Sequence, residues 1–93
     1  MLLCEVATGN VEERLSADSY LHQTLPKGKN SCLGKGRFAP DPAQTVTIGD
    51  VAVPLGQLKD TNLQNPAGYT LQYNEYIAYN TSQIRFRYLL RLK

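Results

Sequence analysis

An alternation of apolar and polar residues marks the C-terminal stretch Gln83-Ile84-Arg85-Phe86-Arg87-Tyr88-Leu89-Leu90-Arg91-Leu92-Lys93. A period of two residues is typical of a β-strand with one buried face, and only Leu89 interrupts it. Residues 70–79 alternate in the same way, and Asn80-Thr81-Ser82 between the two runs predicts a turn. The chain is therefore expected to finish with two consecutive strands.

The rest of the chain alternates between strand-like runs and turn-forming stretches. Residues 2–8 predict another strand, and residues 45–48 and 51–54 flank Gly49-Asp50, a pair suited to a type II′ hairpin. Residues 11–21 show only a weak helical pattern. Residues 25–44 are rich in Gly, Pro, Lys and Asn and predict a long loop, and residues 56–68 predict a second one. Because strand patterns run up to both ends, we expect residues 1–93 to be one part of a larger domain.

Composition limits the classes of function. Ten Lys and Arg against eight Asp and Glu are too nearly balanced to indicate nucleic acid or an anionic membrane as a partner. No apolar stretch approaches the roughly 20 residues needed to cross a bilayer. Cys4 and Cys32 have neither the spacing of metal ligands nor the density of a disulfide scaffold. We therefore predict free thiols and no metal site.

One carboxylate is conspicuous in residues 70–79. Strict alternation places Glu75 on the more apolar face of this predicted strand, with Leu71, Tyr73, Ile77 and Tyr79. A carboxylate on such a face is unfavourable unless it is paired or faces a cleft, so Glu75 is a candidate functional group. Two structural alternatives stay open: the face is only partly covered, or an Arg of a neighbouring strand pairs with Glu75.

The glycine-rich segment 27–37 invites phosphate-binding interpretations, which its details contradict. Five residues separate Gly28 from Gly34 where a P-loop needs four. Residues 34–39 fit the dinucleotide fingerprint formally, but Pro40-Asp41-Pro42 follows where a helix would have to begin. We therefore expect a solvated basic loop that contains Lys27, Lys29, Lys35 and Arg37. The alternative is a nucleic-acid interface, which predicts strongly salt-dependent DNA binding.

Two further polar residues receive no chemical role. His22 has no second ligand or nucleophile at a telling spacing, so it is predicted to lie at the surface or at an edge. Ser31 has no visible base partner, and nucleophilic catalysis is not supported.

Five segments, taken together and in order, resemble the C-terminal half of the poly(ADP-ribose) polymerase catalytic domain, of the ADP-ribosyltransferase family. They are Leu2-Leu3-Cys4-Glu5-Val6-Ala7, Leu25-Pro26-Lys27-Gly28-Lys29-Asn30-Ser31, Pro40-Asp41-Pro42, Val53-Pro54-Leu55-Gly56 and Tyr73-Asn74-Glu75-Tyr76-Ile77. The segment 65–71 and the ending Arg87-Tyr88-Leu89-Leu90 are most similar to the shorter DNA-dependent nuclear type.

This resemblance implies the fold and the activity. The expected fold is α+β with mainly antiparallel strands, and residues 1–93 form a single partial domain. The implied reaction transfers ADP-ribose from NAD, used as a substrate, to protein side chains or to the growing polymer, with release of nicotinamide. The implied setting is the nucleus and the DNA damage response, with DNA bound only through other domains and no membrane partner.

The resemblance also assigns site residues. Glu75 corresponds to the family's catalytic carboxylate, and Tyr73 to a residue on the acceptor side of the cleft that influences elongation. The family's NAD-binding His and Tyr lie in His-Gly and Tyr-Phe-Ala contexts, and neither context occurs in this chain. No residue is therefore assigned to NAD binding, and the isolated chain is predicted to be inactive and to self-associate.

The alternative function is a catalytically incompetent fragment that acts as a protein-interaction or regulatory module. Glu75 favours the enzyme, because inactivated family members often carry Ile or Leu at this position.

Overall fold

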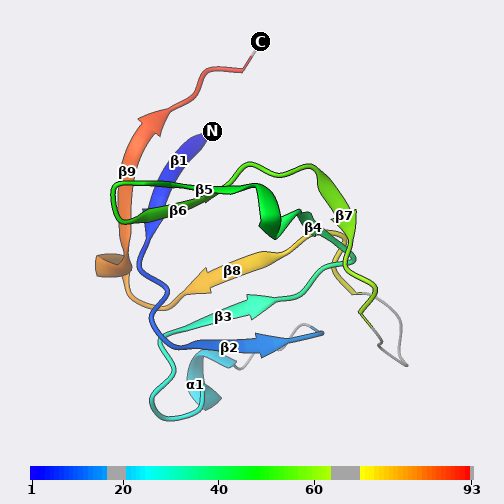
Figure 1. Cartoon of the computed structure of the whole chain (residues 1–93). Helices are drawn as coiled ribbons and strands as arrows, with labels where there is room; N and C mark the ends of the chain where they lie inside the picture. The colour runs from blue at the N-terminus through cyan, green and yellow to red at the C-terminus, as the bar shows by residue number, and fades with distance from the viewer. Residues whose placement is uncertain (17–20, 64–69, 93) are drawn as a thin grey trace.

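The chain is mainly β-structure in the computed structural model, which describes residues 1–16, 21–63 and 70–92 (Figure 1). The strands are β1 (Leu2–Val6), β2 (Val11–Arg14), β3 (Ser31–Gly34), β4 (Phe38–Pro40), β5 (Thr45–Ile48), β6 (Val51–Pro54), β7 (Leu58–Asp60), β8 (Glu75–Ala78) and β9 (Ile84–Leu89). One helical turn, α1 (Leu21–Thr24), and two 3₁₀ turns, η1 (Pro42–Gln44) and η2 (Thr81–Gln83), complete the described elements. Three of the four sheets are purely antiparallel and the fourth is mixed, which confirms the predicted strand-rich α+β class.

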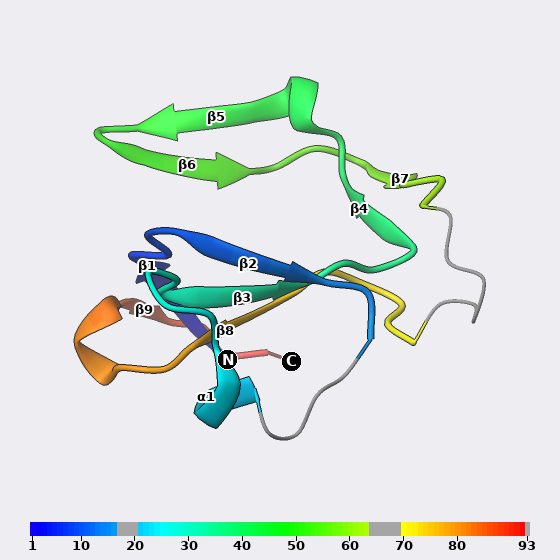
Figure 2. The same ribbon diagram turned by 90° about the horizontal axis from the view of Figure 1, so that it is seen from below.

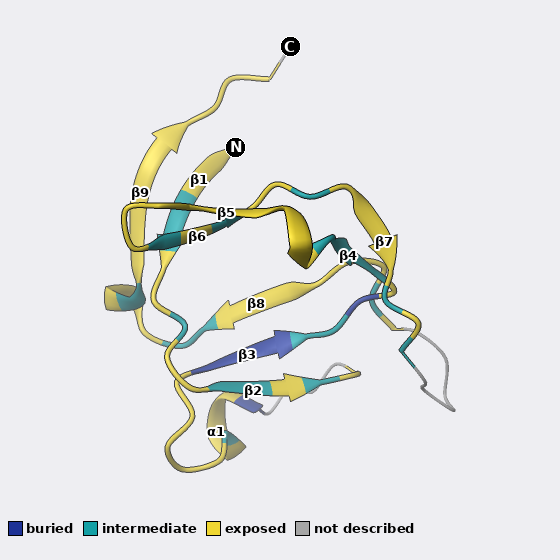
Figure 3. Ribbon diagram, viewed as in Figure 1, coloured by how far each residue is buried: buried dark blue, intermediate teal, exposed yellow. Residues whose placement is uncertain are grey.

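The core lies on the central strand of a three-stranded sheet with the order β2-β3-β8. Strand β2 runs parallel to β3 and β8 runs antiparallel to it. The first three residues of β3, Ser31, Cys32 and Leu33, are buried, together with Leu21 of α1. Figure 3 shows most of β3 in the dark blue of buried residues, between β2 and β8, which are coloured as intermediate or exposed. Both Cys32 and Cys4 are free thiols, as predicted.

The prediction of a long loop over residues 25–44 was wrong, because this segment contains β3, β4 and η1. Strand β3 spans only four residues and has neither β-branched residues nor a clear apolar period, so its local pattern gave no signal. Its conformation is stabilised from outside by hydrogen-bonded neighbours on both sides. The buried Ser31 is accommodated because its Oγ donates a hydrogen bond to the Thr8 carbonyl oxygen at 2.7 Å.

Two other predictions of element type were also wrong. Residues 11–14, where a weak helical pattern was noted over residues 11–21, form β2, and α1 begins at Leu21. Residues 17–20 of that segment lie outside the described residues. The second predicted loop, residues 56–68, contains β7, which pairs with β4. Residues 64–68 of that loop, and residues 65–69 of the segment 65–71, lie outside the described residues.

The strand predicted over residues 83–93 is confirmed in part as β9, which pairs antiparallel with β1. It ends at Leu89, and residues 90–92 are not strand. One face of β9 was expected to be buried, and this is wrong. All six residues of β9 are exposed, with Phe86 71% and Leu89 79% accessible to solvent. The turn predicted at Asn80-Thr81-Ser82 is present as η2, which Asn80 caps by accepting a hydrogen bond from the Ser82 amide at 2.9 Å.

The β5–β6 hairpin is confirmed, and Gly49 has the positive φ, 62°, that a type II′ turn requires at its first position. Figure 2 shows this hairpin set apart from the three-stranded sheet, with β4 and β7 between them. Asp41 fixes the connection: its carboxylate accepts from the Ala43 amide at 3.0 Å and pairs with Lys59 Nζ at 3.0 Å. The hydrogen bond from Ala43, and then the Lys59 ammonium, lower the pKa of the Asp41 carboxyl below its ordinary value.

The chain exposes more surface than a compact domain of its size. Its accessible surface is 7513 Å², against about 5400 Å² expected for its mass. Its radius of gyration is 14.4 Å, against about 12 Å for a compact chain of this length. The open sheet faces therefore leave apolar surface available for contact with further protein. None of the described helices is long and apolar enough to span a membrane.

Candidate functional site

Glu75 is the first residue of β8, at an edge of the three-stranded sheet. Directly paired residues of neighbouring strands point to the same face of a sheet. Glu75 therefore shares its face with Gly34 of β3 and Arg14 of β2, which lie in one row across the sheet. Gly34 contributes no side chain to the middle of this row.

Glu75 has no ion-pair or hydrogen-bond partner for its carboxylate among the described residues. The strand beside Glu75, β3, contains no Arg, and Arg14 lies one strand further away, on β2, where its Nε is 3.1 Å from Glu12 Oε1 without the alignment of a hydrogen bond. The Leu71 side chain lies over Gly34, close to where a Cβ atom would project. The interpretation that an Arg pairs with Glu75 is therefore wrong.

The alternative that this face is only partly covered is confirmed. Glu75 is exposed, and on the same face Ile77 remains 43% accessible. Burial therefore does not explain why a carboxylate occurs here, and the argument from an apolar face does not by itself select Glu75. What the structure provides is an accessible carboxylate on an edge strand, with no partner in the part of the chain that the structure describes.

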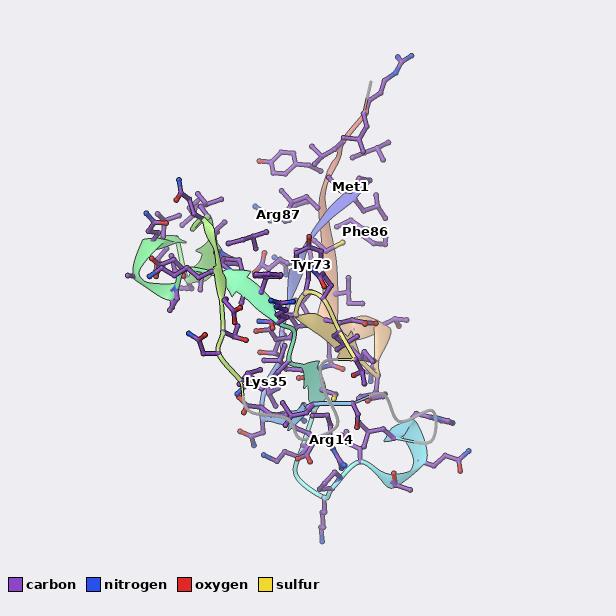
Figure 4. The ribbon with its side chains drawn as sticks, turned by 90° about the vertical axis from the view of Figure 1, so that its right-hand side faces the viewer. Met1, Arg14, Lys35, Tyr73, Phe86 and Arg87 are labelled. Carbon is purple, nitrogen blue, oxygen red and sulfur yellow. The ribbon has the colours of Figure 1, made fainter. Side chains whose placement is uncertain are left out.

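Tyr73 precedes Glu75 in a segment that the sequence predicted to be a continuous strand. The structure interrupts that strand: β8 begins only at Glu75, and Tyr73 forms an isolated parallel bridge with Phe38. The Tyr73 and Phe38 rings are tilted by 43° with centroids 6.5 Å apart, and the Arg37 guanidinium carbon lies 5.2 Å from the Phe38 centroid. Tyr73 is 55% exposed, and Figure 4 shows it near the middle of the molecule, below Phe86 and above Lys35 and Arg14 in that view.

Three of the four basic residues of the segment 27–37 are engaged with other protein groups. Lys35 Nζ pairs with Glu13 at 3.0 Å, Lys29 Nζ donates to the Val11 carbonyl oxygen at 3.2 Å, and Arg37 Nε lies 3.6 Å from Asp60 Oδ2. Two of these partners, Val11 and Glu13, lie on β2 and the third, Asp60, lies on β7, so each of the three cations is already engaged by a separate protein group. The geometry therefore does not favour the nucleic-acid alternative.

The other candidates acquire no chemical role. His22 is exposed on α1, as predicted. The described residues contain no group of three His, Cys, Asp or Glu that could hold a metal ion. An open concavity of about 460 Å³ lies near the far end of β8, where Lys29, Tyr79 and Gln83 contribute to its wall. Neither Glu75 nor Tyr73 lines it.

The contact that shapes this site, in which residues 34–38 cross residues 71–75, was not predicted from the sequence. Gly36 is buried at the crossing, and its amide donates to Asn74 Oδ1 at 2.9 Å. The available signal was Gly36 itself, because a glycine within a short basic run can mark a close backbone approach.

Comparison with known proteins identifies the family. A family model of the poly(ADP-ribose) polymerase catalytic domain matches residues 1–93. The chain is 48% identical over 93 residues to poly [ADP-ribose] polymerase 2 of Homo sapiens, 46% identical over 93 residues to poly [ADP-ribose] polymerase 1 of Danio rerio, and 44% identical over 94 residues to poly [ADP-ribose] polymerase 2 of Arabidopsis thaliana. Each match covers 100% of this chain but only 16%, 9% and 14% of these relatives. The chain therefore belongs to the poly(ADP-ribose) polymerase catalytic domain family.

Proposed function

We propose that the chain forms the C-terminal half of a catalytic domain that transfers ADP-ribose from NAD to protein side chains and to the growing polymer, with Glu75 as the catalytic carboxylate. The supporting observation is that Glu75 combines the family resemblance of segment 73–77 with an accessible carboxylate free of protein partners among the described residues. NAD is a substrate in this proposal, and no metal takes part.

The chemistry suits a preorganised carboxylate. As the bond between ribose and nicotinamide breaks, nicotinamide leaves with the bonding electrons and positive charge develops on the ribose. The Glu75 carboxylate holds a ribose hydroxyl and stabilises that charge. It also orients the acceptor hydroxyl and receives its proton as the new bond forms. An ion pair with Arg14 would oppose both roles, because it would neutralise the carboxylate in advance.

We assign Tyr73 to the acceptor side. It lies two residues before Glu75 and exposes its ring beside Phe38. An aromatic ring at this place can pack against an incoming acceptor, for which base stacking contributes about 1–3 kcal/mol.

Replacing Tyr73 with Ala is therefore expected to shorten the polymer while nicotinamide release stays within about threefold of the parent rate. Gel analysis of polymer length, alongside nicotinamide release, checks this. Full-length polymer from the Tyr73→Ala enzyme would contradict the assignment.

The test of the proposed function compares the isolated chain with a complete enzyme, in which this chain replaces the matching segment of human poly(ADP-ribose) polymerase 2. With labelled NAD, the complete enzyme is expected to modify itself, and the isolated chain is not, because the His-Gly and Tyr-Phe-Ala contexts of the donor site are not in the chain. Automodification by the isolated chain would contradict the second expectation. An inactive but folded complete enzyme would contradict the first.

The second candidate function, a protein-interaction module, is favoured by one observation, the exposed apolar side chains of the β1–β9 ribbon. They include Leu2, Leu3, Phe86, Tyr88 and Leu89. We expect sedimentation of the isolated chain to show self-association through this surface. A chain that remains monomeric at high concentration would weaken this candidate.

For the complete enzyme of the first proposal, we also propose a nuclear location, a role in the DNA damage response and contact with DNA through other domains.

A further inference from the structure

The backbone changes its direction of pairing immediately before Glu75. Gly34 and Glu75 pair in the antiparallel ladder of β3 and β8, whereas Phe38 and Tyr73 form a parallel bridge. The segment between Gly34 and Phe38 must therefore turn where it crosses the segment that leads into Glu75. A regular ladder cannot continue through such a turn, because successive peptide groups no longer face the partner strand.

Gly36 lies at this turn and is buried. Its amide hydrogen bonds to no backbone carbonyl within the described residues, and the Asn74 side chain satisfies it instead, with Oδ1 at 2.9 Å. A Cβ at Gly36 would lie closer than 3.0 Å to the Cα, carbonyl carbon and carbonyl oxygen of Tyr73. The two segments are therefore in direct backbone contact, and one side-chain hydrogen bond joins them at the residue before Glu75.

The same turn is held from its other side by Thr61. The Thr61 hydroxyl lies 2.9 Å from the carbonyl oxygens of both Gly36 and Arg37, and the Thr61 amide donates to the Arg37 carbonyl at 2.8 Å. The turn is thus held on one side by Thr61, and on the other side the Gly36 amide donates to Asn74.

We propose that Asn74 is a positioning residue for Glu75, acting through the Gly36 amide, with Thr61 as the second anchor of the same turn. This inference rests on the proposed function, because Asn74 is given no contact with substrate of its own. Pairing with Gly34 of β3 fixes the backbone of Glu75 itself, and the Asn74 side chain fixes the backbone of the residue before it. The crossing is also joined by two backbone hydrogen bonds, from the Arg37 amide to the Leu71 carbonyl oxygen at 3.1 Å and from the Phe38 amide to the Gln72 carbonyl oxygen at 2.9 Å. Without the Asn74 acceptor, the buried Gly36 amide is left unsatisfied, and the crossing loses the hydrogen bond that lies closest in sequence to Glu75.

The test measures kcat and KM for NAD in the complete enzyme carrying Asn74→Ala. We expect kcat to fall by about 10- to 100-fold, the range produced by displacing a reacting group by about 1 Å, with KM changed less than about threefold. Asn74→Asp keeps an oxygen acceptor for the Gly36 amide and is expected to recover kcat to within about fivefold of the parent.

A matched control is Asn80→Ala. Asn80 also accepts a backbone hydrogen bond through its side chain, from Ser82 at 2.9 Å, but at the far end of β8. We expect it to leave kcat within about twofold of the parent. An Asn74→Ala enzyme whose kcat matches that of Asn80→Ala would overturn the proposal, as would an Asn74→Asp enzyme as impaired as Asn74→Ala.

Two further variants test the positioning role and separate it from the proposed function. If Asn74→Ala does not fold, Thr61→Val decides, because it removes the hydroxyl but keeps the backbone bond to Arg37. A three- to tenfold lower kcat at unchanged KM, about the effect of one neutral hydrogen bond, supports the proposal, and an unchanged kcat overturns it. An active Glu75→Gln enzyme would overturn the proposed function itself. An inactive Glu75→Gln enzyme beside a fully active Asn74→Ala enzyme would overturn the positioning role alone.

Discussion

Replacing Glu75 with Gln is expected to lower the rate of nicotinamide release by the complete enzyme at least about 100-fold, the usual effect of removing one preorganised group that stabilises transition-state charge. Gln has nearly the same shape as Glu, so packing at the start of β8 is preserved. It carries no charge to stabilise the developing positive charge on the ribose, and it cannot accept a proton from the acceptor hydroxyl. The loss is expected in kcat, with KM for NAD changed much less.

A matched control for this substitution is Glu13→Gln. Glu13 lies in the same sheet, but on the opposite face, where it pairs with Lys35 at 3.0 Å and is mostly exposed. Exposed ion pairs contribute about 1 kcal/mol or less, so this variant is expected to keep activity within about twofold of the parent. Equal activity of the two variants, measured by release of labelled nicotinamide, would contradict the catalytic assignment of Glu75.

Local sequence pattern predicted the elements whose conformation is set by their own residues. The β5–β6 hairpin follows from Gly49, whose positive φ starts the turn, and η2 follows from the capping side chain of Asn80. Strand β9 follows from its period of two residues. In each case the determining interaction lies within a few residues of the element, so the signal is visible in a short window of sequence.

The elements that the pattern missed depend on distant residues. Strand β3 is short and lacks strand-forming side chains, and it is extended because β2 and β8 flank it. The alternation of residues 70–79 predicted one strand, but its first half is diverted by the backbone of Gly36. Contacts across 38 positions, such as that of Gly36 with Asn74, leave no periodic trace in the sequence.

The candidate site, too, could be predicted from the sequence only in part. The resemblance of segment 73–77 selects Glu75, whereas the argument from an apolar strand face does not, since Glu75 is exposed and Ile77 is 43% accessible. A strand pattern predicts which side chains share a face, but only the rest of the protein decides whether that face is covered. The positioning of Glu75 through the turn at Gly36 could be inferred only from the three-dimensional structure.

Replacing Gly36 with Ala is expected to be the most damaging substitution outside Glu75, with kcat of the complete enzyme reduced by about 100-fold or more. The new Cβ would lie closer than 3.0 Å to three backbone atoms of Tyr73, and a backbone cannot rotate away as a side chain can. The crossing must therefore open, which moves Tyr73 and the start of β8. Overpacking of this kind typically costs about 1–3 kcal/mol of stability, so the thermal unfolding midpoint is expected to fall as well.

The matched control is Gly34→Ala, two residues away on the same segment. Its Cβ would also lie closer than 3.0 Å to a neighbour, but that neighbour is Leu71 Cδ1, the end of a side chain that can change rotamer. We expect Gly34→Ala to keep kcat within about fivefold of the parent and to unfold at a higher temperature than Gly36→Ala. If both variants lost activity equally, crowding of the sheet face would explain the losses. Only a selective loss in Gly36→Ala ties the activity of Glu75 to the backbone contact between Gly36 and Tyr73.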